Sequence, residues 1–267
     1  MQSVLAKAKN AKLVSEPFPH IVIENALDAS YYTKLAQQFP DISVVNVKGK
    51  PLRNNDDCFM GTVDALKSPQ VAPDWKDFFR YHTSHEFLLE ALQLVSNDAV
   101  KLHPSLAGDL AQVDKSQVIV ADSGQSGRFH MQCQFGSNSP VIEESSVRSA
   151  HIDKPMKIYN ALLYCRSDGD DSAGGDLILY RFNKTPGFYG NRAAMPGRIE
   201  EVLSVPYQAN TLVLFLNSVH SVHGVRPRKP TQHIRRYINF QVEMEQPNFK
   251  VPYINPVVAY LERKFAT

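Results

Sequence analysis

The sequence has few cysteines, and they follow no pattern that would indicate a structural role. Its 267 residues include only Cys58, Cys133 and Cys165, which lie far apart and form no CxxC or Cys/His finger spacing. A disulfide scaffold and a structural zinc finger are therefore not expected. Unpaired cysteines suit a reducing compartment, and we expect a cytoplasmic protein.

The sequence also lacks a strong excess of charge and a long apolar run. Lys and Arg total 29 against 27 Asp and Glu, a net charge of +2, so no nucleic-acid partner and no anionic membrane surface is indicated. The densest apolar run, TLVLFL at 211–216, is as long as a strand and far shorter than the roughly 18 residues of a membrane helix. The lysine-containing first twenty residues lead into no continuous apolar stretch, which argues against a secretory signal.

The remaining composition, 43% hydrophobic and 21% charged, is that of a globular protein. Residues 1–110 read as a mixed, partly helical portion. One helix is expected to begin after Asp28, as its cap, and to end before Pro40. Apolar residues spaced by three and four predict a second helix over about 75–95, and the polar stretch 48–70 reads as loops.

After about residue 115 the pattern becomes one of short β-strands separated by turn signals. The predicted strands are 117–121, 128–135, 147–152, 157–165, 176–182, 201–205, 211–216 and 236–244. No helical patterns separate them, so an antiparallel double sheet is favoured over a parallel one. We expect a mainly β, α+β protein with a jelly-roll core at 111–267, against which residues 1–110 pack within one continuous domain.

Two segments carry residues typical of a metal site. His151 and Asp153 are two positions apart at the end of a strand-like run, so both side chains point to one face and can reach one ion. With nine histidines in the chain, this HxD alone is weak evidence. A third ligand can come from the end of the apolar strand at 211–225, where His220 and His223 are both candidates.

The segment IRRYINF at 234–240 places two guanidinium groups on a predicted strand. Arg235 and Arg236 are adjacent and therefore lie on opposite faces. The arginine on the buried face needs a partner, and a bound dicarboxylate would match its fork of donors. The other arginine is expected to be exposed.

Taken in order, these segments resemble the Fe(II)- and 2-oxoglutarate-dependent dioxygenases, most closely the prolyl-4-hydroxylase-like branch. The resemblance includes HxD, then HGV, then R-x-Y-I, together with PFPHIVIENAL at 17–27 and LLYCRSDGDDSAGGDLILY at 162–180. It covers about residues 17–40 and 128–244. It implies a double-stranded β-helix in which His151, Asp153 and His223 hold Fe(II), with His220 as the competitor for the third place.

The resemblance also implies the co-substrate site. Arg235 matches the arginine that pairs with the far carboxylate of 2-oxoglutarate, with Arg236 as the alternative if the register slips by one residue. Tyr164 matches a tyrosine that hydrogen bonds to the same carboxylate, or it is an ordinary core tyrosine.

Other polar residues are open candidates for the pocket. His130, Gln132 and Gln134 alternate along one predicted strand and line either the pocket or a polar outer face, and Asn239 could support the co-substrate. Arg148 is expected to face away from His151, because it lies three positions, an odd number, before His151 on a regular strand. The histidines 82, 85 and 103 are expected to be structural or exposed.

The resemblance implies hydroxylation of a C–H bond with O2, releasing succinate and CO2, with ascorbate as an accessory reductant. The expected substrate is a peptidyl residue such as proline, or a small molecule. The alternatives are a cupin-like metalloenzyme that does not use 2-oxoglutarate, although no HxH sequence typical of cupins is present, and a non-catalytic jelly-roll binding module.

Overall fold

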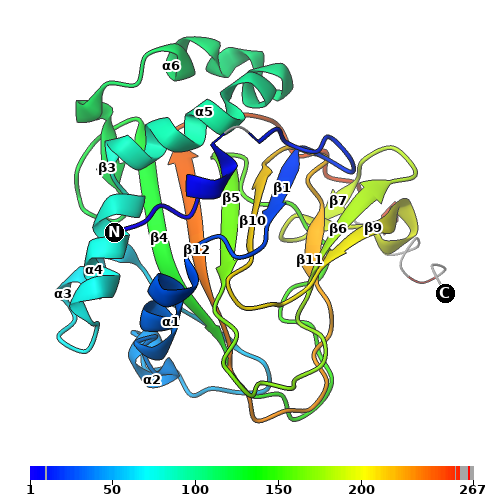
Figure 1. Cartoon of the computed structure of the whole chain (residues 1–267). Coiled ribbons are helices and arrows are strands. Elements are labelled where there is room, and N and C mark those ends of the chain that lie inside the picture. The colour runs from blue at the N-terminus through cyan, green and yellow to red at the C-terminus, as the bar shows by residue number, and fades with distance from the viewer. Residues whose placement is uncertain (10, 256, 259–263, 265–267) are drawn as a thin grey trace.

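The computed structural model describes residues 1–9, 11–255, 257–258 and 264. Figure 1 shows a large sheet, a smaller sheet beside it, and helices of the N-terminal half gathered against the large sheet. The helices and 3-10 turns are η1 Ala6–Ala8, α1 Ala29–Gln37, α2 Ile42–Val45, α3 Thr62–Lys67, α4 Pro73–His82, α5 His85–Leu102, η2 Pro104–Leu106, α6 Ala107–Ala111, η3 Lys115–Gln117 and η4 Pro196–Arg198. The strands are β1 His20–Ile23, β2 Asp57–Met60, β3 Val118–Val120, β4 Phe129–Asn138, β5 Lys157–Tyr164, β6 Leu177–Phe182, β7 Phe188–Tyr189, β8 Ala193–Ala194, β9 Ile199–Val205, β10 Leu212–Leu216, β11 His223–Val225 and β12 Arg235–Met244.

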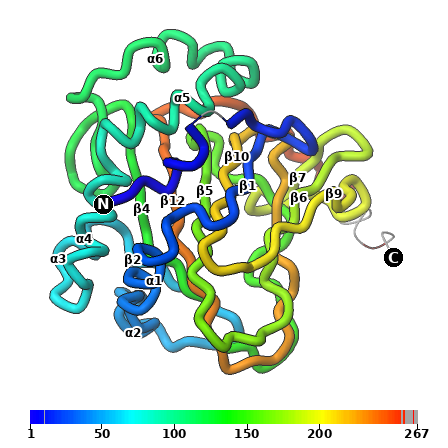
Figure 2. Tube along the Cα trace, in the orientation of Figure 1, coloured from blue at the N-terminus to red at the C-terminus, as the bar shows by residue number. Residues whose placement is uncertain are grey.

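The sheet order is that of a jelly roll. The large sheet runs β1-β10-β5-β12-β4-β2 with β3 on β4, and the small sheet runs β11-β6-β9. From β4 to β12 the chain passes repeatedly between the two sheets, as the tube in Figure 2 shows. The segment around His151 takes part in this alternation through an antiparallel bridge to β11. The predicted fold class is therefore confirmed, with helix and strand present in nearly equal shares, about 26% and 28%.

Strand β12 shows how the sequence sorts its side chains between the two faces of the large sheet. Ile238, Phe240 and Val242 are buried in the larger core beneath the helices. Tyr237 lies in the second core, between the sheets. Because successive side chains alternate, Arg235 shares the face of Tyr237, and Arg236 points to the helix side. The inner face of β12 therefore borders the space between the sheets.

The helices cover the large sheet through aromatic contacts. The ring of Trp75 in α4 lies 5.0 Å from that of Phe135 in β4, and Phe78 packs 6.0 Å from Phe240. The single helix predicted over 75–95 is wrong, because the structure has α4 and α5 with a break between them. At the break, Ser84 Oγ accepts a hydrogen bond from the Phe87 N–H and starts a new helix. Helix α1 begins after Asp28 as predicted, but the Asp28 side chain forms no capping hydrogen bond.

Two further segments differ from the sequence prediction. Residues 48–70, expected to be loops, contain β2 and α3. Strand β2 pairs with β4, and its side chains alternate between exposed and buried, a pattern too short to stand out in the sequence. The predicted strand 147–152 is reduced to the bridge residue His151. Within the described residues, no helix has the length and apolar character needed to cross a bilayer.

Candidate metal and co-substrate site

His151 and His223 are neighbours on the small sheet. They are partners in an antiparallel bridge, and the backbone N–H of each donates to the carbonyl of the other at 2.9 Å. Their ring centroids lie 4.4 Å apart. His223 lies 70 positions after Asp153, and the chain between them includes β5, β6, β9 and β10, so the jelly-roll topology is what brings these distant segments together.

Both imidazoles are oriented by the same local contact. His151 Nδ1 lies 2.8 Å from the Ser149 carbonyl, and His223 Nδ1 lies 2.9 Å from the Ser221 carbonyl. A carbonyl only accepts, so each Nδ1 carries the proton and each Nε2 keeps a free lone pair. Burial lowers the pKa of His151 to about 3 and also lowers the pKa of His223. Both rings are therefore neutral at physiological pH, the form that binds a metal ion.

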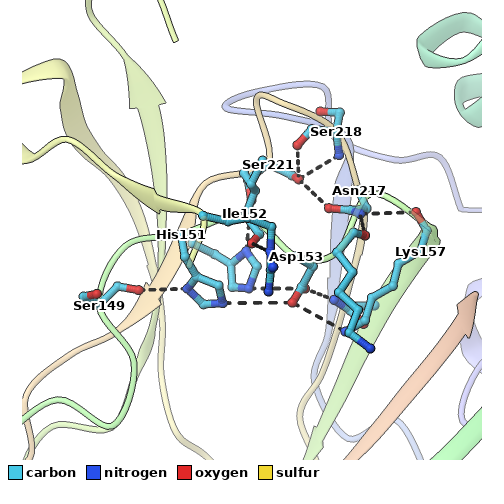
Figure 3. A network of polar contacts seen from close by, with 12 residues as sticks. Ser149, His151, Ile152, Asp153, Lys157, Asn217, Ser218 and Ser221 are labelled. Atoms are coloured by element: carbon cyan, nitrogen blue, oxygen red, sulfur yellow. Dashed lines mark hydrogen bonds and ion pairs between the residues drawn. The ribbon is translucent and has the colours of Figure 1, made fainter. Parts of the chain in front are cut away.

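Asp153 completes the cluster. Its carboxylate lies 4.0 Å from His151 Nε2 and 3.6 Å from His223 Nε2, and Figure 3 shows Asp153 and His151 pointing toward one another. Burial alone would raise the pKa of Asp153, but the Lys157 ammonium outweighs it, together with the two imidazoles once acid protonates them, and the pKa lies well below its ordinary value. The carboxylate is therefore ionised.

Asp153 is also fixed from the side of the large sheet. Lys157 Nζ lies 3.4 Å from the Asp153 carboxylate, and the Asn160 side-chain amide donates a hydrogen bond to it. Lys157 Nζ also donates to Asn160 Oδ1 at 3.2 Å. Both residues belong to β5, so the sequence reasoning, which followed only the HxD motif, did not identify them. Such groups orient a ligand and tune its charge.

A second set of hydrogen bonds ties the loops that carry the cluster (Figure 3). Asn217 is completely buried, and its side-chain amide donates to the carbonyls of Lys154 at 2.7 Å and Lys157 at 3.2 Å. Ser221 Oγ donates to Asn217 Oδ1 at 3.3 Å and to the Ser218 carbonyl at 2.9 Å. Asn217 therefore joins the segment after Asp153 to the loop that leads to His223.

The cluster fits a divalent metal ion. His151, Asp153 and His223 each offer a ligand atom, and these atoms lie within 4.8 Å of one another, the one such group among the described residues. Two neutral imidazoles and one carboxylate, with the remaining directions open to a cavity, form the donor set that suits non-haem Fe(II). His220 lies outside the cluster. It is exposed in the turn before β11 and contacts the ring of Phe182.

Arg235 lies in the same cavity as the cluster and is only 2% exposed. Its Nε donates to the Gly175 carbonyl at 2.9 Å and its Nη1 to Asn138 Oδ1 at 3.3 Å, whereas Nη2 is buried without a partner. No Asp or Glu of the described chain pairs with it. Gly175 has φ +86, and a side chain there would meet Arg235 Cδ at 3.2 Å and Nε at 3.3 Å, so glycine permits this close approach.

Three tyrosine rings surround the Arg235 guanidinium, at 5.1 Å for Tyr164, 5.0 Å for Tyr207 and 4.9 Å for Tyr237. The Tyr164 hydroxyl is buried without a partner. Burial raises the pKa of Tyr164 to about 12, so the phenol keeps the proton it can donate. A carboxylate could accept hydrogen bonds from both orphaned donors, Tyr164 Oη and Arg235 Nη2, so this end of the cavity fits the far end of a dicarboxylic acid.

Arg236 points to the opposite face of the sheet. Its Nε donates to the Cys165 carbonyl at 3.1 Å and its guanidinium lies over the ring of Phe39. The sequence reasoning missed both Tyr207 and Tyr237. Tyr237 could have been found, because it lies two positions after Arg235 and so shares its face of the strand. Tyr207 follows β9 and reaches Arg235 only through the fold.

The remaining candidates divide between the cavity and the rest of the fold. The cavity has a volume of about 400 Å³, and its lining includes Gln134, Asn239 and Arg148. His130 and Gln132 do not line it, and Gln132 Oε1 instead accepts from the Thr62 N–H at 3.3 Å.

The expectation that Arg148 faces away from the site is wrong. It rested on a regular strand over 147–152, and the chain there is irregular. The three histidines expected outside the site lie outside it, and two of them, His82 and His103, are buried.

No family model matches the chain, and no curated protein matches it. Among solved structures, the chain is similar to a prolyl 4-hydroxylase from Phytophthora capsici, with 14% identity, 91% of this chain and 68% of that chain covered, and a TM-score of 0.46. It is similar to a Pseudomonas putida prolyl-4-hydroxylase, with 14% identity, 85% and 93% covered, and a TM-score of 0.43. It is also similar to the epimerase SnoN in complex with Fe3+, alpha ketoglutarate and nogalamycin RO, with 11% identity, 86% and 82% covered, and a TM-score of 0.47.

Proposed function

We propose that the protein is an Fe(II)- and 2-oxoglutarate-dependent oxygenase that hydroxylates a C–H bond of its substrate. One observation carries the proposal: a His-Asp-His cluster and a buried arginine without a carboxylate partner in the described chain lie in one cavity. The cluster has the donor atoms for ferrous iron, and the arginine has the donors for a dicarboxylate.

In this proposal His151, Asp153 and His223 hold the metal through two Nε2 atoms and one carboxylate. The carbonyls of Ser149 and Ser221 keep both rings in the tautomer with a free Nε2. Asn160 and Lys157 fix the carboxylate from β5. Ferrous iron, 2-oxoglutarate and O2 together supply the oxidising power for hydroxylation, with release of succinate and CO2.

Arg235 and Tyr164 would orient the co-substrate by its far carboxylate. The guanidinium is held by Gly175 and Asn138 and enclosed by aromatic rings, so it is positioned before the ligand arrives. Such preorganisation lowers the entropic cost of placing the reacting groups. The same buried rings exclude water from this end of the cavity.

The broader proposal includes the organisation and setting of the chain. We infer that residues 1–110 and 111–267 form one continuous domain, because β1 pairs with β10 and β2 with β4. The three free, buried cysteines suit the reducing cytoplasm. The substrate is a peptidyl residue or a small molecule.

The test is release of succinate by the purified protein with Fe(II), ascorbate, O2 and 2-oxoglutarate. We expect Arg235→Gln to raise the concentration of 2-oxoglutarate needed for half-maximal release by roughly 10- to 100-fold, because a charged hydrogen-bond pair is lost. The matched variant Arg236→Gln removes the neighbouring charge from the other face and should behave as the wild type. Metal binding with no response to 2-oxoglutarate would favour a cupin-like enzyme, and absence of both would leave a binding module.

A further inference from the structure

The acidic side chains that line the cavity all have basic partners. The pairs are Asp153 with Lys157 at 3.4 Å, Asp57 with Lys50 at 3.7 Å, and Glu243 with Lys154 at 3.8 Å. The negative charge of the protein in the cavity is therefore balanced locally. Any cationic side chain left over is available to an anion from outside the chain.

Two cationic side chains of the cavity are left over in the described chain, Arg235 and Arg148. The proposed co-substrate accounts for Arg235. Arg148 is half-buried three residues before His151, and its guanidinium forms no hydrogen bond or ion pair with a described residue. The guanidinium of Arg148 therefore offers its donors and its charge to the cavity, where every carboxylate of the lining is already paired, and it fits a second anionic group from outside the chain.

A patch of three side-chain amides lies on the inner face of the large sheet in the same cavity. We call Gln134, Asn239 and Gln241 the amide patch. Gln134 and Asn239 are directly opposite each other on β4 and β12, and Gln241 is two positions farther along β12. None of the three amides forms a hydrogen bond within the described chain, and Gln241 Oε1 is buried without a partner. Each amide offers both donors and an acceptor to a ligand.

We propose that the substrate hydroxylated at this site is a small carboxylic acid with further hydrogen-bonding groups, such as a free amino acid or hydroxy acid. Arg148 binds its carboxylate, and the amide patch binds its amino or hydroxyl groups. This inference rests on the proposed function. The cavity of about 400 Å³ is near the small end of the range for ligand sites and also receives the co-substrate, which favours a small molecule.

The first experiment compares acids with their amides on the whole protein. Mn²⁺ replaces iron so that no turnover occurs, and binding to the protein with Mn²⁺ and 2-oxoglutarate is measured by calorimetry. The probes are the common L-amino acids and their 2-hydroxy analogues, each beside its primary amide. We expect at least one acid to bind and its amide to bind roughly 10- to 100-fold more weakly, because the charged partner of Arg148 is gone.

The second experiment changes the arginine. Arg148→Gln should weaken binding of that acid by roughly 10- to 100-fold and abolish the preference for acid over amide, while Arg148→Lys retains part of the preference. The control Arg80→Gln removes an exposed arginine of α4 that pairs with Asp77 at 2.7 Å, far from the cavity lining, and should keep the preference. The acid–amide comparison needs only the wild-type protein, so a variant that fails to fold does not remove the test.

Several outcomes would overturn the inference. They are no binding by any acid, equal binding by acids and amides, or tight binding of a neutral proline-containing peptide that Arg148→Gln does not alter. Failure of the proposed function is a separate result, since it would appear first as absence of binding of Mn²⁺ with 2-oxoglutarate to the wild-type protein.

Discussion

His151 and His223 face each other across a bridge in which the backbone N–H of each donates to the carbonyl of the other at 2.9 Å. The spacing between the two imidazoles is therefore set by main-chain hydrogen bonds and does not depend on side-chain packing alone. The backbone fixes this geometry before any ligand binds, which is what a metal site requires of its supporting structure.

The first prediction separates the two histidines that follow β10. His223→Ala removes one of the three proposed ligands and should weaken binding of Mn²⁺ or Fe(II) by more than roughly 100-fold, beyond the usual cost of losing a supporting contact. The matched variant His220→Ala changes an exposed residue three positions before the start of β11 and should bind the metal as the wild type does. Metal affinity measured by calorimetry decides between them. If His220→Ala gave the larger loss, the assignment of the third ligand would be wrong.

The second prediction concerns the Tyr164 hydroxyl. Tyr164→Phe keeps the ring beside Arg235 and removes only the orphaned donor, so the affinity for 2-oxoglutarate should fall by roughly 10-fold. The matched control is Tyr159→Phe. Tyr159 also lies in β5 with a buried hydroxyl lacking a partner, but it belongs to the core beneath the helices. Binding of 2-oxoglutarate to the Mn²⁺-loaded variants gives the comparison, and an equal effect of both changes would contradict the role of Tyr164.

The third prediction concerns the buried amide that ties two loops of the site together. Asn217→Ala leaves the carbonyls of Lys154 and Lys157 without their donor and should lower the free energy of unfolding by about 1–3 kcal/mol. Denaturant unfolding measures this loss, and Asn46→Ala, which removes an exposed amide bonded to the Lys50 carbonyl, serves as the control. The same Asn217 variant should bind Mn²⁺ more weakly, because Asp153 and His223 are no longer tied together. Unchanged metal affinity would show that this contact is purely structural.

The fourth prediction is a loss of stability in acid caused by His82. Its Nε2 accepts the Val4 N–H at 3.2 Å and its Nδ1 donates to the Phe78 carbonyl at 2.8 Å, so both nitrogens are satisfied only in the neutral ring. Burial lowers the pKa of His82 to about 3, whereas an unfolded chain has a histidine pKa of about 6.5. The unfolded state therefore takes up a proton first as the pH falls, and stability declines from about pH 6.5 toward about pH 3.

Through His82, the free energy of unfolding should fall by about 2 kcal/mol between about pH 7.5 and about pH 5. His82→Gln should show a decline smaller by that amount, measured by denaturant unfolding at the two pH values. Phe78→Leu, which loosens the same core without changing a titrating group, should lower the free energy of unfolding equally at both. If the free energy of unfolding of His82→Gln fell with pH as much as that of the wild type, His82 would be excluded as the cause of the acid sensitivity.

The sequence predicted the jelly-roll core and named the three residues that the structure brings into one cluster, because strand alternation and the order HxD, HGV and R-x-Y-I are local patterns. Alternation also implied that only one of Arg235 and Arg236 could face the interior, but the buried face could not be chosen without the pairing of β12 with β5 and β4. The break before α5 was missed because apolar spacing continues across Thr83 and Ser84, and the cap there is a single side chain.

The errors near the site have a common physical cause. The face of Arg148 was deduced from a regular strand, but only His151 of that stretch is bridged, so the two-residue period does not apply. Lys157 and Asn160 lie in a strand that carries no motif. Asn217 acts through contacts with a segment that is distant in the sequence. Such contacts depend on tertiary structure, and a pattern in one sequence does not contain them.

The arrangement of Asp153 has a mechanical consequence. The two imidazoles belong to the small sheet. The Asp153 carboxylate, in contrast, forms an ion pair with Lys157 and accepts a hydrogen bond from Asn160, both in the large sheet. An ion bound by all three would cross-link the two layers of the jelly roll. Removing the metal ion with a chelator should then weaken the contact between the two sheets. Amide hydrogen exchange should become faster around β11, while the centre of β12 stays protected.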